Sequence, residues 1–315
     1  MQINQATVAA LFKGYRVQFL EAYQAGKAMW DQIAMRTTSN AAEEIYHWLG
    51  SVPGLRRLVG EVAIENLTAH NYSIKNDEFA VIVQVKQADV ERDAYGLYNP
   101  MFQSLGLAAK QHPDELVSGL LINGFSQTDY TGKNFFDANK KAEPDTKFPF
   151  TNKDTRGLGP QSFADARTSI KSRLNAKGRP MNLGQDLLLV VSPQNEVVAR
   201  QILQADFIQQ TAQGGTQGTA PIAAVTNVNK GTARFVVWPQ LASNPNMWFL
   251  MDVGYPVRPF ILQVEKEVQL LSLTQATDDV VFHKHVFEYQ AYGRYNAGYG
   301  LPELAFGSTG TTAAA

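Results

Sequence analysis

Few residues of this chain combine the type and spacing that catalysis or metal binding requires, and two histidines come nearest. His283 and His285 are two residues apart, so on a β-strand both imidazoles would point to one face and could share a metal ion. The same pattern fits two half-buried imidazoles that alternate with Phe282 and Phe287 on a sheet. No third ligand is apparent in the sequence, so we expect no metal site.

A run of carboxylates offers a second candidate for ion binding. Asp89, Glu91 and Asp93 alternate at strand spacing, and several oxygen ligands close together would suit calcium. The alternative is that these carboxylates are solvated, or that they pair with arginines of a neighbouring chain.

Two further polar residues have simple structural explanations. Ser192 directly precedes Pro193, which predicts a helix cap rather than a nucleophile. Lys75 stands beside Asn76 and Asp77, a pair that could turn a hairpin, so its amine could meet an Asn or Asp of another chain. A covalent Lys–Asn bond would need a buried carboxylate to assist it, and a solvated lysine is therefore the expectation.

No catalytic or nucleotide-binding motif is complete. The stretch GFSQT lacks the second glycine of a nucleophile elbow, YTGKN lacks the upstream glycine of a phosphate loop, and GLGPQS lacks the third glycine of a dinucleotide-binding turn. The chain has no cysteine, which excludes disulfides, thiolate metal sites and a cysteine nucleophile. We expect no catalytic residue and no cofactor.

Composition indicates an ordinary globular protein with few surface charges. The 315 residues are 44% hydrophobic but only 18% charged, and a surface with few charges is typical of a protein covered by partners. The net charge of −1 argues against a dedicated nucleic-acid reader. We expect no signal peptide and no membrane span. The absence of cysteine suits a reducing cytoplasm but is compatible with either side of a membrane.

The first half of the chain shows two helical patterns separated by a strand pattern. Apolar residues at helical spacing run from Val8 to Tyr23 and again from Asn99 to Gly124, where Pro113 should kink or restart the helix. Between them, strand-like patterning runs through residues 58–86, and its last strand places four apolar side chains on one face. A two-stranded hairpin cannot bury such a face alone, so another element must cover it.

The second half alternates strands and helices before it returns to long strands. A helix at residues 162–178, a buried strand LLLVVS and a second helix that begins at Pro193 indicate an α/β lobe at about residues 158–254. Strands are expected at 234–238 and 247–253, and two long strands follow Tyr255. The tail GSTGTTAAA should be disordered or loosely held.

The order of these elements, with six short stretches, resembles HK97-type major capsid proteins of tailed phages and, more narrowly, the Mu-like phage major head subunit. The stretches are WLGSVPGLRRLVGE, ADVERDAYGLYNP, LLINGF, GKNFFD, RPFILQ and AYGRYNAGYGLPELAFGS, spread between about residues 48 and 308. One departure follows RPFILQ, where VEKEV stands in place of the more basic residues we would expect.

The resemblance implies an α+β fold with five parts. These are an N-terminal arm (1–50), an extended β-hairpin loop (51–95), a peripheral domain with a long spine helix (96–157), an α/β axial domain (158–254), and peripheral-domain strands with the C-terminal tail (255–315). Because the head-like pattern begins by about residue 48, we expect little room for a cleaved N-terminal scaffolding segment.

The resemblance also implies the function and partners of a major capsid protein. Copies would self-assemble into hexamers and pentamers that form an icosahedral virion shell, built in the host bacterial cytoplasm, around double-stranded DNA bound without sequence readout. Scaffold, portal and decoration proteins are further candidate partners, and a membrane is not.

In such a shell the neighbouring subunit would cover the apolar face of the hairpin. The residues expected at this contact are Trp48, Leu49, Arg56, Arg57, Glu61, Lys75, Phe79, Val81, Val83 and Val85. Two alternatives remain open: an enzyme with a catalytic α/β domain at 158–254, and a minor, decoration or tail protein of the virion with a related fold.

Overall fold

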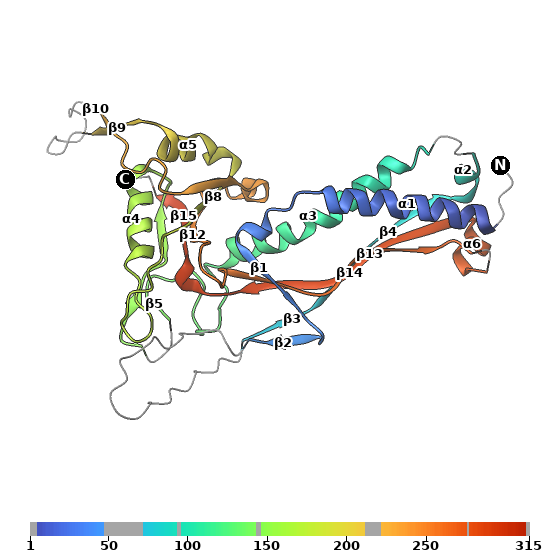
Figure 1. Ribbon diagram of the computed structural model, residues 1–315, viewed down its shortest axis with the longest axis horizontal. Helices are drawn as coiled ribbons and strands as arrows, with labels where there is room; N and C mark the ends of the chain where they lie inside the picture. Colours follow the sequence, from blue (N-terminus) through green and yellow to red (C-terminus); the bar gives the residue numbers. More distant parts are fainter. Residues whose placement is uncertain are drawn as a thin grey trace, which may run out of the picture.

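The chain forms a long arm and a lobe that lie next to each other along its longest axis (Figure 1). The computed structural model describes residues 5–46, 72–92, 96–142, 146–211, 222–275 and 277–312. We use "arm" for the four-stranded sheet with its two long helices, and "lobe" for the five-stranded sheet with the helices packed on it.

The arm is built on long antiparallel strands from the C-terminal part of the chain. Its strand order is β1-β13-β14-β4, in which β1 (Ala34–Thr38) runs parallel to β13 and the other pairs are antiparallel. The remaining strands are β13 (Phe260–Leu273), β14 (Val286–Tyr299) and β4 (Asp77–Lys86). The two long strands confirm the β pattern expected after Tyr255, except at residues 280–284, which form a helix instead of the start of the second strand.

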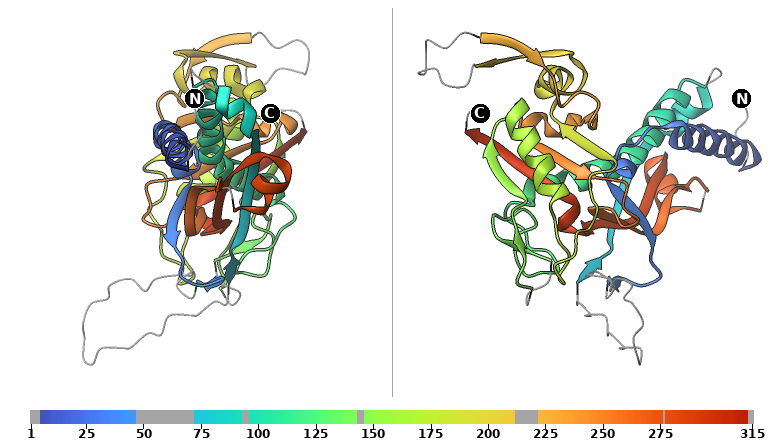
Figure 2. Two further views of the ribbon diagram at one scale, coloured as in Figure 1. Left: turned by 90° about the vertical axis from the view of Figure 1, so that its right-hand side faces the viewer. Right: turned by 60° about the vertical axis from the view of Figure 1, so that its left-hand side comes forward.

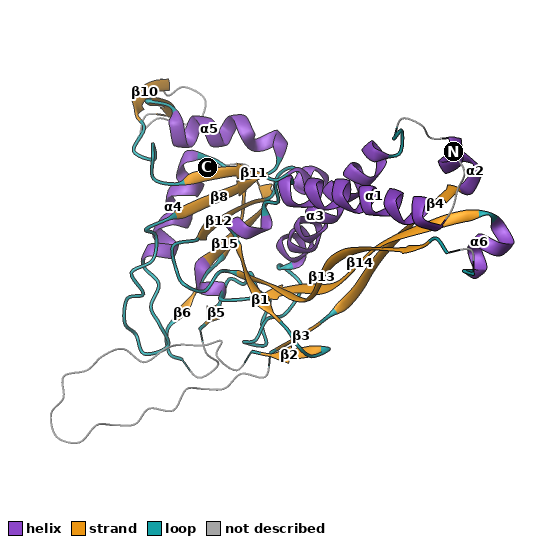
Figure 3. Cartoon of the chain, turned by 45° about the vertical axis from the view of Figure 1, so that its right-hand side comes forward, coloured by secondary structure: helices purple, strands orange, loops and turns teal. Residues whose placement is uncertain are grey.

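Two helices cover one face of the arm sheet, as Figure 3 shows from the side. They are α1 (Gln5–Ala25) and α3 (Asn99–Asn123), and both match the sequence prediction. Tyr15 and Phe19 of α1 and Phe102 of α3 are buried with Tyr289 of β14 in one cluster. The helices approach closely at Gly106, where a Cβ atom would lie 2.4 Å from the carbonyl oxygen of Phe19.

The helix α3 continues through Pro113, so of the kink or restart expected there the restart does not occur. The next residue, Asp114, is buried and accepts hydrogen bonds from the backbone N–H groups of Met29 and Trp30, at 2.9 and 2.7 Å. Burial raises the pKa of this carboxyl group, while the two N–H groups oppose that shift. Asp114 thereby fastens the segment after α1 to the middle of α3.

The lobe contains a five-stranded sheet of order β11-β8-β12-β15-β7 with α4 and α5 packed on it. The strands are β7 (Lys153–Arg156), β8 (Leu187–Val191), β11 (Arg234–Val237), β12 (Trp248–Asp252) and β15 (Ala305–Thr312). The helices are α4 (Pro160–Lys171) and α5 (Glu196–Gln204). Every residue of β8 is buried, which confirms the buried strand expected at LLLVVS, although the strand ends one residue earlier, at Val191.

The expectation of a loose C-terminal tail is wrong as far as Thr312. Strand β15 lies inside the lobe sheet, antiparallel to β12 and parallel to β7. Close packing requires its small residues: a Cβ at Gly307 would lie 3.0 Å from ring atoms of both Phe136 and Phe249. The lobe sheet therefore extends beyond residues 158–254 at both ends.

The expected hairpin turn at Asn76 and Asp77 is also wrong. Strand β3 (Ser73–Lys75) pairs with β2 (Glu43–Ile45), whereas β4 pairs with β14 in a different sheet. Asn76 joins these two pairings and fixes the crossing, since its amide donates to the Ser39 hydroxyl and the Ala41 carbonyl.

The remaining elements are short. They are η1 (Trp30–Gln32), α2 (Gln87–Arg92), β5 (Lys140–Lys141), β6 (Pro149–Phe150), η2 (Pro193–Asn195), β9 (Phe207–Thr211), β10 (Ile222–Thr226), η3 (Pro239–Ser243), α6 (Asp279–Lys284) and η4 (Pro302–Leu304). Strands β9 and β10 form a ribbon that projects from the lobe, visible in the right-hand view of Figure 2.

Candidate functional site

The two histidines do not share a strand face. His283 lies in the short helix α6, and His285 ends that helix in the left-handed conformation with φ of 52°. The His283 Nε2 atom is 3.2 Å from Asp279 Oδ1, one helical turn away. This arrangement positions the rings as surface residues of a helix end.

The carboxylate run and the candidate cap also differ from expectation. Asp89 and Glu91 belong to the helix α2, so they do not alternate at strand spacing, and Asp93 lies outside the described residues. Ser192 occupies the N-cap position of η2, but its hydroxyl donates to the Pro245 carbonyl at 2.5 Å and caps nothing. The side chain therefore joins two loops of the lobe.

The described residues contain no cluster of three or more His, Asp or Glu side chains able to hold a metal ion. Within the same ranges, no helix is long and apolar enough to cross a membrane.

Sequence reasoning missed a group of buried charges between the arm and the lobe. Lys140 Nζ lies 2.7 Å from Asp129 Oδ2, and both side chains are fully enclosed. Burial raises the pKa of Asp129 and lowers the pKa of Lys140, in each case against the attraction of the partner. Lys140 also donates to the Asn134 carbonyl at 2.8 Å, so the pair holds the loop after α3 in place.

A second buried pair of charges lies beside the first. Burial raises the pKa of Glu303 to about 7 and lowers the pKa of Arg173 to about 9. The Arg173 guanidinium donates to the backbone carbonyls of Pro302, Glu303 and Ala305. These contacts tie the end of α4 to the start of β15.

The face of β4 that the sequence singled out is largely covered by its own chain. Val85 is 4% exposed and packs among the arm helices, and Phe79 lies against the rings of His112 and Tyr295, 4.5 and 4.9 Å between centroids. The expectation that this face has no cover within its own chain is therefore wrong at these two positions. Val83 is half-buried, and Val81 remains 47% exposed.

The other predicted contact residues are Lys75 and five residues outside the described part of the chain. Lys75 is exposed at the end of β3, where its carbonyl accepts a hydrogen bond from Asn296 at 2.9 Å. Five positions lie outside the described residues: Trp48, Leu49, Arg56, Arg57 and Glu61.

The opposite face of the arm sheet carries exposed apolar side chains. Ile82 of β4 and Leu271 of β13 flank Gln290 of β14 in register, on the face of the sheet opposite to that of the buried Leu270, Tyr289 and Ala291. Ile82 is 55% exposed, and Leu271 and Leu273 are also exposed. We call Ile82, Leu271 and Leu273 the outer apolar row. Figure 1 shows the long helices α1 and α3 on the other side of the sheet.

An elongated molecule with an uncovered apolar row has the properties of an assembly subunit. Residues 8–157 and 229–315 match the family of the Mu-like prophage major head subunit gpT. The chain belongs to this family.

Similar proteins confirm the assignment as a major head subunit. The Mu-like prophage FluMu major head subunit of Haemophilus influenzae is 26% identical over 298 residues, which are 95% of this chain and 71% of that protein. The major capsid protein of Escherichia phage Mu is 25% identical over 305 residues, which are 97% of this chain and 74% of that protein.

The fold agrees with that of assembled phage heads. The procapsid subunit of bacteriophage JBD30 superposes with a TM-score of 0.58 at 25% identity, over 97% of this chain and 76% of that chain. The head subunit thus has the HK97-type capsid fold, and it is a major capsid protein of the Mu-like phage type, as the sequence resemblance predicted.

Proposed function

We propose that copies of this head subunit assemble into hexamers and pentamers that form an icosahedral shell around double-stranded DNA, and that the subunit has no enzymatic activity. The observation that carries the proposal is the outer apolar row on an elongated arm. An exposed apolar patch on a soluble protein marks an interaction site. Its relatives are named as structural head and capsid proteins, which supports the absence of an enzymatic role.

Ring formation follows from the shape of the subunit. A contact between two different surfaces of the same chain repeats from copy to copy, and it closes into a ring when the rotation allows. A subunit with several such contacts, each burying on the order of 1,600 Å² in total, can form a persistent shell from individually weak interfaces. Weak contacts also permit correction of errors during assembly.

The proposal keeps some of the predicted contact residues at contacts between copies and assigns others to the core of their own subunit. Val81, which is exposed on β4, and Lys75, at the end of β3, are candidates to touch a neighbouring copy, whereas the side chain of Val85 serves the core of its own subunit. The arm and lobe would correspond to the peripheral and axial domains, and Trp48, Leu49, Arg56, Arg57 and Glu61 would lie in the extended loop.

The enclosed DNA would be held by charge alone. Contacts to phosphate are electrostatic and carry no sequence information, and in a chain whose net charge is −1 they would have to come from local groups of Lys and Arg. Scaffold, portal and decoration proteins would be further partners, with assembly in the host cytoplasm.

The test changes two of the three residues of the outer apolar row without touching the core. The double variant I82D/L271D places two carboxylates on the uncovered face. It should reduce at least tenfold the fraction of the protein that sediments as assembled shells, while the melting curve of the unassembled subunit stays the same. The control is Q111D, which adds a carboxylate at an exposed position of α3. Normal shell yield from the double variant would refute the assigned role of this surface.

A further inference from the structure

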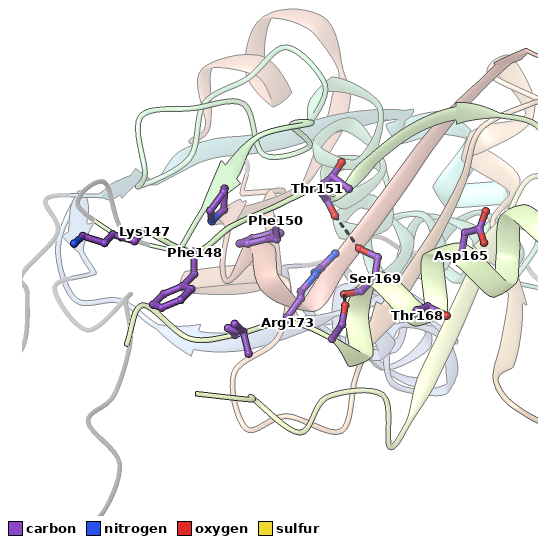
Figure 4. A pocket seen from close by; sticks show the side chains of 11 residues that line it. Lys147, Phe148, Phe150, Thr151, Asp165, Thr168, Ser169 and Arg173 are labelled. Atoms are coloured by element: carbon purple, nitrogen blue, oxygen red, sulfur yellow. Dashed lines mark hydrogen bonds between the residues drawn. The ribbon is translucent and has the colours of Figure 1, made fainter. Parts of the chain in front are cut away.

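A cleft of about 510 Å³ opens on the lobe, between the segment of residues 147–151 and the helix α4. Figure 4 shows its lining: the two phenylalanines of the segment face the hydroxyl-bearing side of α4 across the opening. The volume is in the range of sites that bind a ligand or a side chain of a partner. None of the contacts described above involves this cleft.

The lining has an apolar wall and a polar wall. Phe148, Pro149, Phe150 and Leu174 form the apolar side, and Thr168, Ser169 and Ser172 form the polar side. The position of the segment is fixed, because the Thr146 hydroxyl donates to the Ala176 carbonyl at 2.9 Å and the Phe148 ring lies over Gly178.

Positive charge is concentrated at the cleft. Arg173 lines it, is only 2% exposed, and stacks on Phe150 with 4.8 Å between its guanidinium carbon and the ring centroid. Its Nε and Nη2 atoms have no hydrogen-bond partner within the described part of the chain. Lys147 stands at one end of the cleft, and its side chain points outward (Figure 4).

The surrounding sequence strengthens this charge. Residues 140–179 contain ten Lys and Arg against four Asp and Glu, a net charge of +6 in a chain whose total is −1. The carboxylate at the other end of the cleft, Asp165, is paired with Arg156 at 2.8 Å. An occupant with an apolar group and a negative charge would therefore match the cleft.

The far end of the arm presents such a group. Phe282 of α6 is 68% exposed, although large aromatic side chains are usually covered, and Asp279 lies one turn earlier with its side chain 91% exposed. Figure 1 shows α6 and the lobe at opposite ends of the molecule, so α6 cannot reach the cleft of its own chain. Only another copy can bring the two together.

We propose that Phe282 of one subunit enters the cleft of a neighbouring subunit and that its Asp279 carboxylate lies beside Lys147 of that neighbour. The contact joins two different surfaces, so it propagates head to tail and contributes to the shell. This inference rests on the proposed self-assembly and names one of the contacts that produce it.

Charge reversal tests the pairing. K147E and D279K should each lower the yield of sedimenting shells at least tenfold, and K147E/D279K together should recover it to within about threefold of the unchanged protein. The control K13E reverses an exposed lysine on α1 and should change little. If the double variant is no better than either single one, the pairing is wrong. If F282A prevents assembly while K147E has no effect, the arm tip meets a different surface, and the proposal is overturned.

A second measurement does not depend on yield. Because the chain has no cysteine, the variant K147C/D279C has only these two thiols, and they are too far apart to join within one chain. Oxidation of assembled particles should produce a ladder of disulfide-linked oligomers on a non-reducing gel, whereas K13C/D279C should remain monomeric. Particles of K147C/D279C that yield no ladder would overturn the contact, whereas unchanged protein that forms no particles would contradict the proposed function itself.

Discussion

The strand β4 allows a matched test of which apolar side chains belong to the subunit core. Val81 and Val85 lie on the same face of the same strand, but Val85 is 4% exposed and Val81 is 47% exposed. V85A removes two buried methyl groups at about 0.8 kcal/mol each, and the cavity that they leave adds to this loss. We expect V85A to lower the free energy of unfolding of the unassembled subunit by about 2 kcal/mol.

The same change at Val81 should have less effect, because about half of its side chain is already in water. Without a cavity term, V81A should lower the free energy of unfolding by about 0.8 kcal/mol or less. Urea denaturation of unassembled subunits, followed by tryptophan fluorescence, measures both values under the same conditions. Equal losses for the two variants, or a larger loss for V81A, would refute the assignment of Val85 to the core and of Val81 to the surface.

Two further predictions concern backbone packing and buried charge. G106A should destabilise the subunit, because the added Cβ would press on the Phe19 carbonyl. G119A in the same helix places its Cβ where nothing lies within 4 Å, so it should stabilise the subunit by about 0.5–1 kcal/mol. Thermal melts of both variants measure these effects, and a G106A variant as stable as the unchanged protein would contradict the close contact between the helices. Burial raises the pKa of Glu303 to about 7, so the folded state keeps a proton that the unfolded state releases near pH 4.5. Stability should therefore fall between pH 4.5 and 7, by on the order of 3 kcal/mol from this group, and E303Q should remove that part of the slope in urea titrations at pH 5 and 8. An unchanged slope would show that Glu303 is ionised in the folded state.

The helices and buried strands of this head subunit could be predicted from local patterns. The spacing of apolar residues, with Gly26 and Gly124 as stops, places α1 and α3 to within a few residues. The five consecutive aliphatic residues of β8 predict a strand buried on both faces, and they form one. In each case the signal lies within a single element.

The predictions that failed concern residues whose packing partners lie far away in the sequence. The alternation in β4 predicts a buried face but not its cover, which comes from α1, α3 and a strand about 200 residues later. The stretch at residues 279–284 is rich in strand formers, yet it forms a helix that ends at His285. Tertiary context overrides local preference at both places.

Features of the candidate sites were likewise missed where they depend on residues far away in the sequence. The small residues of β15 look like those of a loose tail, although the close approach of Phe136 and Phe249 requires a glycine at position 307. The buried charges Asp129 and Glu303 have no local pattern, because their partners arise from other loops. The exposure of Phe282 is a property of the folded arm and cannot be derived from its neighbours in the sequence.

Electron microscopy of the purified subunit tests the central claim most directly. The account predicts closed shells whose averaged images have icosahedral symmetry and in which every arm contacts a neighbouring copy. Discrete soluble monomers at concentrations well above those of cell extracts, or open tubes without fivefold vertices, would contradict it.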